Sequence, residues 1–215
     1  MFAQTHKTDT IRFCPLYGKE NLKTDLYYKI GNDSVLIENL KFYISGLEFL
    51  QQGRVVWQEQ HSFHLIDVSN LKTATICCRI PANINFTQIK FNLGIDSITN
   101  VSGALAGDLD PTKGMYWAWQ SGYINFKLEG KSSLCKTRAN EFQLHLGGYQ
   151  FPFNSLKTVV LNVLDKDKTT ITLDIEQLLK ALNLSQQNHM MSPKAEAVLL
   201  SETVSKLFRV SNNEK

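Results

Sequence analysis

The chain lacks any hydrophobic run that could cross a membrane. A spanning helix needs roughly 20 consecutive apolar residues, and no stretch of the 215-residue sequence approaches that length. The first residues also lack the charged and apolar regions of a complete signal peptide. We therefore expect no membrane span. We expect residues 1–8 to be flexible, and the small residue Ala3 makes the segment Phe2-Ala3-Gln4 resemble the stub of a trimmed export signal.

Clustered positive charge is also absent. Lys and Arg number 23 against 20 Asp and Glu, which gives a formal net charge of +3, and the two signs are interleaved along the chain. A protein that follows nucleic-acid phosphates usually carries a basic stripe or patch. We therefore do not expect a nucleic-acid partner.

The sequence contains no familiar motif of a catalytic or zinc site. GxSxG, HExxH, the P-loop and the dinucleotide-binding fingerprint are absent, and no cysteine stands in a recognisable nucleophile setting. We therefore predict that the chain is not an enzyme. The four cysteines show no CxxC pair, which disfavours a zinc site made of cysteine ligands. A disulfide from Cys77 or Cys78 to Cys14 or Cys135 stays open, although a strand would point only one of the vicinal pair to each face.

Composition and patterning favour one mainly β domain that covers residues 1–215. Hydrophobic residues make up 43% and charged residues 20% of the chain, and no repeat or linker divides it. Apolar and polar residues alternate over most of the first three quarters, as a strand with one buried face requires. The predicted strands cover residues 11–16, 40–44, 55–58, 62–66, 73–80, 84–93, 124–129 and 141–146.

The last quarter predicts a hairpin. Residues 158–163 and 169–175 are rich in β-branched side chains and flank the polar segment 165–168, so we expect these two strands to pair with each other.

Two short helices are expected after the hairpin. Asp174 is placed to cap a helix over residues 175–182, and Ser192-Pro193 precedes a second helix that starts at Lys194 and runs to about residue 208. The expected fold is therefore an antiparallel β-sandwich with two short C-terminal helices.

Residues 99–114 form the longest irregular stretch that the sequence predicts, and ordered loops of this length often carry function. Acidic residues in and just before this stretch offer oxygen ligands for calcium, but their spacing does not fit the twelve-residue calcium loop. We interpret them as turn-forming residues. They are Asp96, Asp108 and Asp110.

An aromatic segment follows this stretch. If the chain is extended from Met115 onwards, Met115, Trp117 and Trp119 share one face. Such a stripe is more often part of the core or an ordinary surface feature than a binding site. An exposed stripe would instead provide the stacking platform of a lectin-like carbohydrate- or protein-binding module without metal, which is our alternative hypothesis. That platform would consist of Tyr116, Trp117, Trp119 and Tyr123.

His64 and His145 are the candidate metal ligands. Each alternates with apolar neighbours in a predicted strand, and each taken alone is more often a hydrogen-bonded surface residue than a ligand. Taken together with Met115, they offer imidazole and thioether groups, which suit copper, and thioether favours the Cu(I) state. Asp67 is a candidate to orient the His64 ring. We expect the two imidazoles to converge beside the tryptophan pair.

Several segments together resemble the MbnP-like family of methanobactin-associated copper-binding proteins. The strongest match is GMYWAWQSGYINFKLEG, residues 114–130. The blocks occur in the family's order and cover most of the chain from about Leu40 onwards. The other blocks are FYISGLEF (42–49), FHLID (63–67), FNLGIDSITN (91–100), LDP (109–111), FQLHLGGY (142–149) and MMSPKAEA (190–197).

The resemblance implies a β-sandwich exported to the periplasm or cell surface, with a role in copper homeostasis or acquisition. It also implies a partner similar to the dihaem MauG peroxidases, which oxidises a tryptophan of the copper protein to kynurenine. Carried onto this chain, it implies Trp117 or Trp119 as the modified residue, and His64 and His145 as copper ligands. The ligand role of Met115 rests on its position beside the tryptophans.

Overall fold

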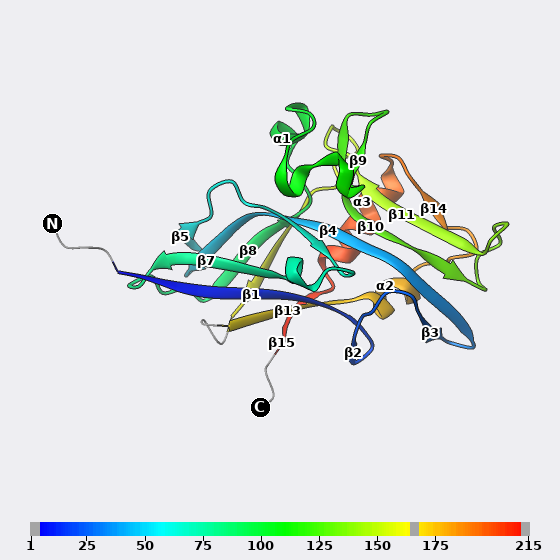
Figure 1. The fold of residues 1–215 in the computed structure, drawn as a ribbon, viewed down its shortest axis with the longest axis horizontal. Helices are drawn as coiled ribbons and strands as arrows, with labels where there is room; N and C mark the ends of the chain where they lie inside the picture. The colour runs from blue at the N-terminus through cyan, green and yellow to red at the C-terminus, as the bar shows by residue number, and fades with distance from the viewer. Residues whose placement is uncertain (1–4, 164–167, 212–215) are drawn as a thin grey trace.

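A single strand of 19 residues organises the larger of two β-sheets. In the computed structural model, which describes residues 5–163 and 168–211, this strand is β4, Asp33–Gln51, and it runs along most of the molecule (Figure 1). One edge of β4 pairs in turn with β3 (Leu26–Ile30), β6 (Phe63–Asp67) and β5 (Arg54–Gln58). The other edge pairs with β10 (Gly122–Ser132) and β8 (Gln88–Leu93). The sheet continues through β12 (Lys157–Asn162), β11 (Glu141–Gly147) and β14 (His189–Met190), and β9 (Tyr116–Trp117) pairs with β10.

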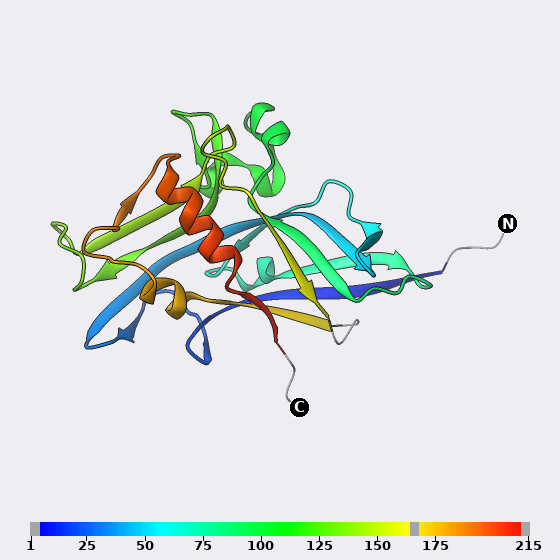
Figure 2. The same ribbon diagram turned by 180° about the vertical axis from the view of Figure 1, so that it is seen from behind.

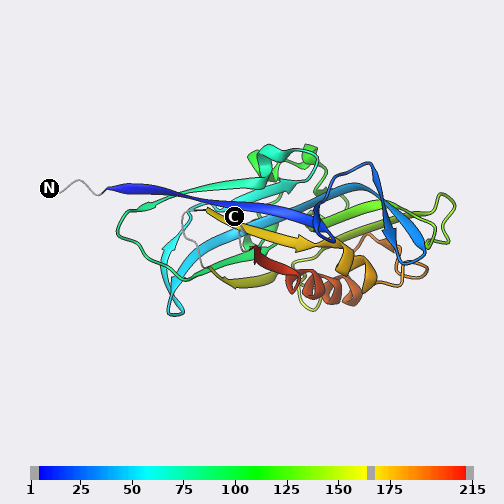
Figure 3. The same ribbon diagram turned by 90° about the horizontal axis from the view of Figure 1, so that it is seen from below.

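The smaller sheet packs against one face of the larger sheet and lies in front of it in Figure 3. Its central strands are β1 (His6–Tyr17) and β13 (Lys168–Asp174), which run parallel, and β15 (Phe208–Ser211) pairs with β13. The other edge of β1 pairs with β7 (Thr75–Pro81) and β2 (Glu20–Asn21). The β11–β14 pair is also parallel, and the remaining pairs of described strands are antiparallel. The predicted mainly β sandwich is confirmed, with these two parallel pairs as the departure.

Two short helices follow in the last quarter, as predicted. α2 covers Ile175–Lys180, and its first turn is capped by Asp174, whose Oδ1 accepts a hydrogen bond of 2.9 Å from the Gln177 amide. α3 covers Ala195–Ser205 and packs beside β11 and β12, which is seen from behind in Figure 2. No helix of the described residues is long and apolar enough to span a bilayer.

The predicted hairpin of residues 158–163 and 169–175 is wrong. β12 pairs with β8 in the larger sheet, whereas β13 pairs with β1 and β15 in the smaller sheet. The polar segment between them therefore joins the two sheets, and its residues 164–167 lie outside the described part of the chain. Local alternation predicts that two strands exist, but their partners are chosen by packing between distant segments.

The first strand begins earlier than the predicted residues 11–16. β1 starts at His6 and pairs with β7 from that residue on, so residues 6–8, within the segment expected to be flexible, belong to a strand. Residues 1–4 lie outside the described residues.

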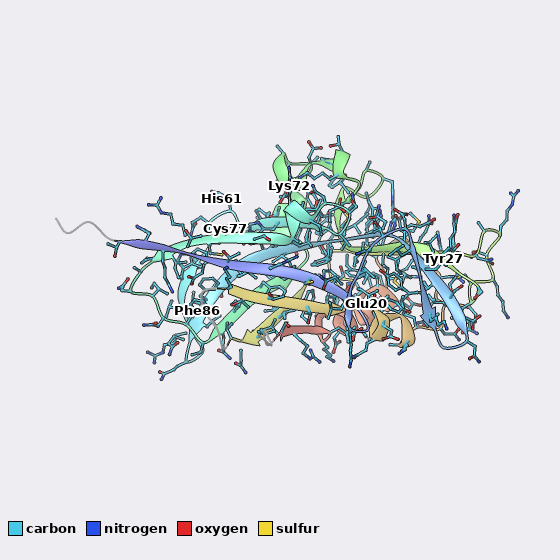
Figure 4. The ribbon with its side chains drawn as sticks, turned by 60° about the horizontal axis from the view of Figure 1, so that its bottom comes forward. Glu20, Tyr27, His61, Lys72, Cys77 and Phe86 are labelled. Atoms are coloured by element: carbon cyan, nitrogen blue, oxygen red, sulfur yellow. The ribbon has the colours of Figure 1, made fainter. Side chains whose placement is uncertain are left out.

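None of the four cysteines forms a disulfide. Cys77 is exposed on β7 and Cys78 is buried, so the vicinal pair points to opposite faces as expected. Cys77 pairs with Thr10 of β1, and Cys14 lies four residues further along that strand. Four residues of a strand span about 13 Å, whereas the Cα atoms of a disulfide lie within roughly 7 Å of each other. Sγ of Cys14 donates a hydrogen bond to Oδ1 of Asn21, the residue after Glu20. Figure 4 shows Cys77 well apart from Glu20.

Around Tyr43 of β4 the larger sheet is buried on both faces. Its inner face, with Phe42 and Ile44, packs against the smaller sheet and the two C-terminal helices to form the inner core. Its outer face is covered by residues 95–123, here called the cap, which contain α1 (Ser97–Val101) and β9 and lie uppermost in Figure 1. The outer core beneath the cap consists of Tyr43, Leu65, Ile95, Leu109, Met115, Trp117, Tyr123 and Ile124.

Four phenylalanines join the two sheets across the inner core. Phe13 and Phe208 come from the smaller sheet, and Phe42 and Phe91 come from the larger one. Their contacting rings lie with centroids 5.4 to 6.4 Å apart in edge-to-face arrangements, and each residue is at most 1% exposed. Edge-to-face pairs add about 0.5–1.5 kcal/mol to the burial of the rings, so this cluster stabilises the packing of sheet on sheet.

Phe13→Ala should lower the free energy of unfolding by about 3–5 kcal/mol, because it removes a ring that contacts three others and leaves a cavity. Urea unfolding measures the change. Phe151→Ala is the matched control, since Phe151 is 97% exposed and its loss should change stability by no more than about 0.5 kcal/mol. Equal effects of the two variants would contradict the role of the cluster.

Candidate metal centre at His145

Four polar side chains form a row across the outer face of the larger sheet. The cross-strand registers of four neighbouring strands place each of them beside the next. Because cross-strand partners point to the same face, all four lie on the side of the sheet that carries Tyr43. The row consists of Asp67 on β6, Lys41 on β4, Lys127 on β10 and His145 on β11.

His145 is held by a carboxylate and leaves one ring nitrogen unpaired. Its Nε2 lies 2.7 Å from Oε1 of Glu129, and Oε2 of Glu129 accepts a hydrogen bond of 2.8 Å from Nδ2 of Asn39. His145 is 4% exposed, and its Nδ1 is buried without a hydrogen-bond partner. Metal-binding histidines almost always donate the other ring N–H to a carboxylate, a carbonyl or water, and His145 has this arrangement.

The charge of Glu129 decides which nitrogen carries the proton. The hydrogen bond from His145 is the largest influence and lowers the pKa of Glu129 to about 2, against the opposing effect of burial. Glu129 is therefore ionised at neutral pH and only accepts hydrogen bonds, so Nε2 of His145 is the donor. A protonated Nδ1 would be a buried donor without an acceptor, which is disfavoured by about 1–3 kcal/mol. In the neutral imidazole the lone pair therefore lies on Nδ1.

Trp117 lies on the same face of β11, against the backbone of Gly147. A Cβ atom at Gly147 would lie 2.5 Å from Cζ3 of Trp117, so glycine is needed for this close approach. Gly147 is two residues from His145, and positions two apart in a strand share a face. The structure therefore brings the indole to within one pleat of the imidazole. Nε1 of Trp117 is buried and has no hydrogen-bond partner.

Met115 lies in the same layer. It is fully buried in the outer core with Trp117, and its backbone carbonyl accepts a hydrogen bond of 2.9 Å from the Ile124 amide. Ile124 is the cross-strand partner of Gly147. Of the candidate residues, Met115 and Trp117 share the outer core, and His145 lies on the same face of the sheet, one pleat from the Gly147 that Trp117 contacts.

Trp119 does not continue this face. β9 ends at Trp117, and a turn over residues 118–121 carries Trp119 to the surface, where it is 66% exposed. Its ring still lies beside that of Trp117, with centroids 5.8 Å apart and planes inclined by 42°. The four-residue platform of the alternative hypothesis is not formed, because Trp117 and Tyr123 are buried.

His64 lies on the opposite face of the larger sheet. It pairs with Ile44 of β4, a residue of the inner core, whereas His145 belongs to the row of Lys41. Its Nε2 lies 2.7 Å from Oε2 of Glu59, whose pKa is lowered by this bond and one from Ser62 although burial opposes the shift. The expected convergence of the two imidazoles is therefore not found, and a shared ligand set of His64 and His145 is ruled out.

Asp67 does not orient His64. It lies on the outer face and forms an ion pair of 2.9 Å with Nζ of Lys41. Hydrogen bonds from Ser69 and Lys41 lower its pKa against the effect of burial. The carboxylate that holds His64 is Glu59, so the expected role of Asp67 is corrected.

The acidic residues of the cap have structural roles, as predicted. Asp108 accepts a hydrogen bond from the Leu65 amide, which ties the cap to β6. It also forms an ion pair of 2.6 Å with Lys113. Asp96 and Asp110 accept hydrogen bonds from backbone amides at the first turns of α1 and of a short helix, Pro111–Lys113. These contacts fix the cap over the row.

Among residues 5–163 and 168–211, no group of three or more His, Cys, Asp or Glu side chains could hold a metal ion. A site at His145 must therefore draw further ligands from other types of donor, and Met115, in the outer core on the same side of the sheet, is a candidate. No sequence pattern indicated Glu129, Asn39 or Gly147 as part of the site. The close contact at the glycine was detectable, because glycine inside a strand marks close approach of another group.

Glu129→Gln should remove a stabilising effect that depends on pH. The low pKa of Glu129 stabilises the folded state by about 3 kcal/mol above pH 4.5, and this effect is lost as the pH falls towards 2. Urea unfolding at a series of pH values should therefore show a difference between wild type and variant that shrinks with acidification. Glu141→Gln, at an exposed site on β11, is the control. A constant difference across this range would contradict the assigned pair.

The comparisons with known proteins agree with this architecture. The profile of the MbnP family matches residues 6–192. Among solved structures, MbnP from Methylosinus trichosporium is similar with a TM-score of 0.69 and 14% sequence identity, over 91% of this chain and 88% of that one. No curated protein matches the chain. The family match spans the cap, the row and both sheets, and the chain belongs to the MbnP family.

Proposed function

We propose that this protein is an exported copper-binding member of the MbnP family, which holds copper at Nδ1 of His145. The observation that carries the proposal is a buried imidazole with one nitrogen fixed by Glu129 and the other unpaired. Metal-binding histidines usually have this arrangement, because the carboxylate bonded to the other ring nitrogen sets the tautomer and the ring orientation.

The surroundings favour cuprous copper. Met115 is buried in the neighbouring outer core, and a thioether prefers Cu(I) to harder ions. Lys127, the next residue in the row, places positive charge near the site. Burial, and to a smaller extent Lys41, lowers the pKa of Lys127, while Glu129 opposes this. The ionised Glu129, whose Oε1 lies 3.9 Å from Nζ of Lys127, offsets this positive charge, so the preference for Cu(I) rests on the thioether.

We further propose that Trp117 is the residue that a dihaem MauG-like peroxidase oxidises to kynurenine. Trp117 lies one pleat from His145, so a nitrogen or oxygen donor made from its indole would be close to the bound copper. Trp119 lies outside this layer. The chain is then a substrate of its partner and not itself an enzyme, and the periplasm or cell surface is the compartment in which copper is acquired or stored.

His145→Ala should abolish tight Cu(I) binding in a titration against a chromophoric Cu(I) chelator. His64→Ala should bind as wild type does, because His64 lies on the other face of the sheet, and His189→Ala provides a control at an exposed position. Glu129→Gln should weaken binding by about 10- to 100-fold, since it removes the group that orients the ring. A loss with His64→Ala equal to that with His145→Ala would contradict the site.

Coexpression with the dihaem peroxidase should convert Trp117 and leave Trp119 and Trp57 intact. Peptide mass spectrometry distinguishes the three sites, because each tryptophan is assigned by its own fragment ions. Protein expressed without the peroxidase is the control. Conversion of Trp119 with Trp117 unchanged would overturn this assignment and leave the copper site at His145 to be judged by the titration.

A further inference from the structure

Trp117 and Trp119 form a pair of indoles that differ sharply in exposure. Trp117 is 5% exposed and Trp119 is 66% exposed, and their ring centroids are 5.8 Å apart. Among the described residues, Trp119 is the aromatic ring in contact with Trp117. A large partner can therefore touch Trp119 directly but reaches Trp117 only through other groups.

We propose that Trp119 is a one-electron relay through which an oxidant at the surface oxidises the buried Trp117. The proposal rests on the proposed function in taking Trp117 as the modified residue, and it adds the route by which the electron leaves. The oxidant class is a high-potential one-electron acceptor, such as the high-valent haem iron of a peroxidase.

Each transfer is a balanced one-electron step. The oxidant takes one electron from Trp119 and is reduced by one unit, which leaves the Trp119 indole as a radical cation. Trp117 then passes one electron to Trp119, which returns to its neutral state, while Trp117 becomes the radical cation. Nε1 of Trp117 has no hydrogen-bond acceptor in the described structure, so its proton stays on the ring during the transfer.

The route through Trp119 is favoured over a route through the tyrosines of the outer core. Electron tunnelling weakens steeply with distance, and the two indoles are neighbours in space. Tyrosine oxidation also requires loss of the phenolic proton, and burial raises the pKa of both Tyr43 and Tyr123. Tyr116, which contacts Tyr123 at a centroid distance of 5.0 Å, is the partly exposed end of that rival route.

The surface around Trp119 is open to an oxidant. The neighbouring Gln120 lines a cavity of about 200 Å³ together with Tyr149 and Phe151, and Phe151 is itself exposed. Because Trp119 is itself 66% exposed, a flat cofactor edge or a small metal complex can approach its indole from solvent.

The test uses purified, unmodified full-length protein without copper and without peroxidase. Tris(bipyridine)ruthenium(II), illuminated with a cobalt(III) ammine as electron acceptor, generates ruthenium(III) in air-saturated buffer. Oxidised products at each tryptophan are quantified by peptide mass spectrometry. In wild type we expect oxidation of Trp117. In Trp119→Phe, which keeps an aromatic ring but removes the oxidisable indole, oxidation of Trp117 should fall several-fold.

Two comparisons separate a relay from a structural role. Trp119→Tyr should restore much of the Trp117 oxidation, because an exposed phenol also gives up an electron. Products at Trp57, whose ring packs on Phe49 far from the pair in sequence, should be the same in all variants. Undiminished oxidation of Trp117 in Trp119→Phe, or its loss in Tyr116→Phe instead, would overturn the relay. The coexpression experiment measures separately which tryptophan the peroxidase converts, so failure of the relay and failure of the Trp117 assignment can be told apart.

Discussion

The burial of both faces of β4 is the constraint on which the rest of the structure depends. Phe42 and Ile44 point into the inner core, and Tyr43 between them points into the outer core, each with no exposed surface. An apolar outer face needs a cover, and residues 95–123 provide it. The candidate metal centre lies at the margin of this second core, where polar side chains are withdrawn from water while one imidazole nitrogen remains without a partner.

Most strands could be predicted, because alternation reflects a local property, the burial of one face. Their partners could not. Residues 158–163 and 169–174 look like the two arms of a hairpin, yet they belong to different sheets. The polar segment between them is compatible with a tight turn and equally with a crossover, and only the packing of distant strands distinguishes the two.

The histidines show the same limit at the level of one residue. His64 and His145 both stand between apolar neighbours, so their local patterns are equivalent. In β6, however, Leu65 is buried in the outer core, while in β11 Leu144 and Leu146 are buried in the inner core. The two imidazoles consequently face opposite sides of one sheet. Deciding this from sequence would require the register of each strand against β4 and β10, which is a long-range property.

The contact between Trp117 and Gly147 determines which part of the Trp117 side chain could change chemically without moving the strand. The atoms nearest the missing Cβ are Cζ3 and Cη2, both in the benzene half of the indole. A reaction that opens the pyrrole ring of Trp117 would leave its benzene ring in contact with Gly147. The nitrogen would become an aniline amine that is bonded directly to the benzene ring, so its position would still be set by the contact with the glycine. A rigid backbone contact would thus let the chemistry change without the surrounding strands having to repack.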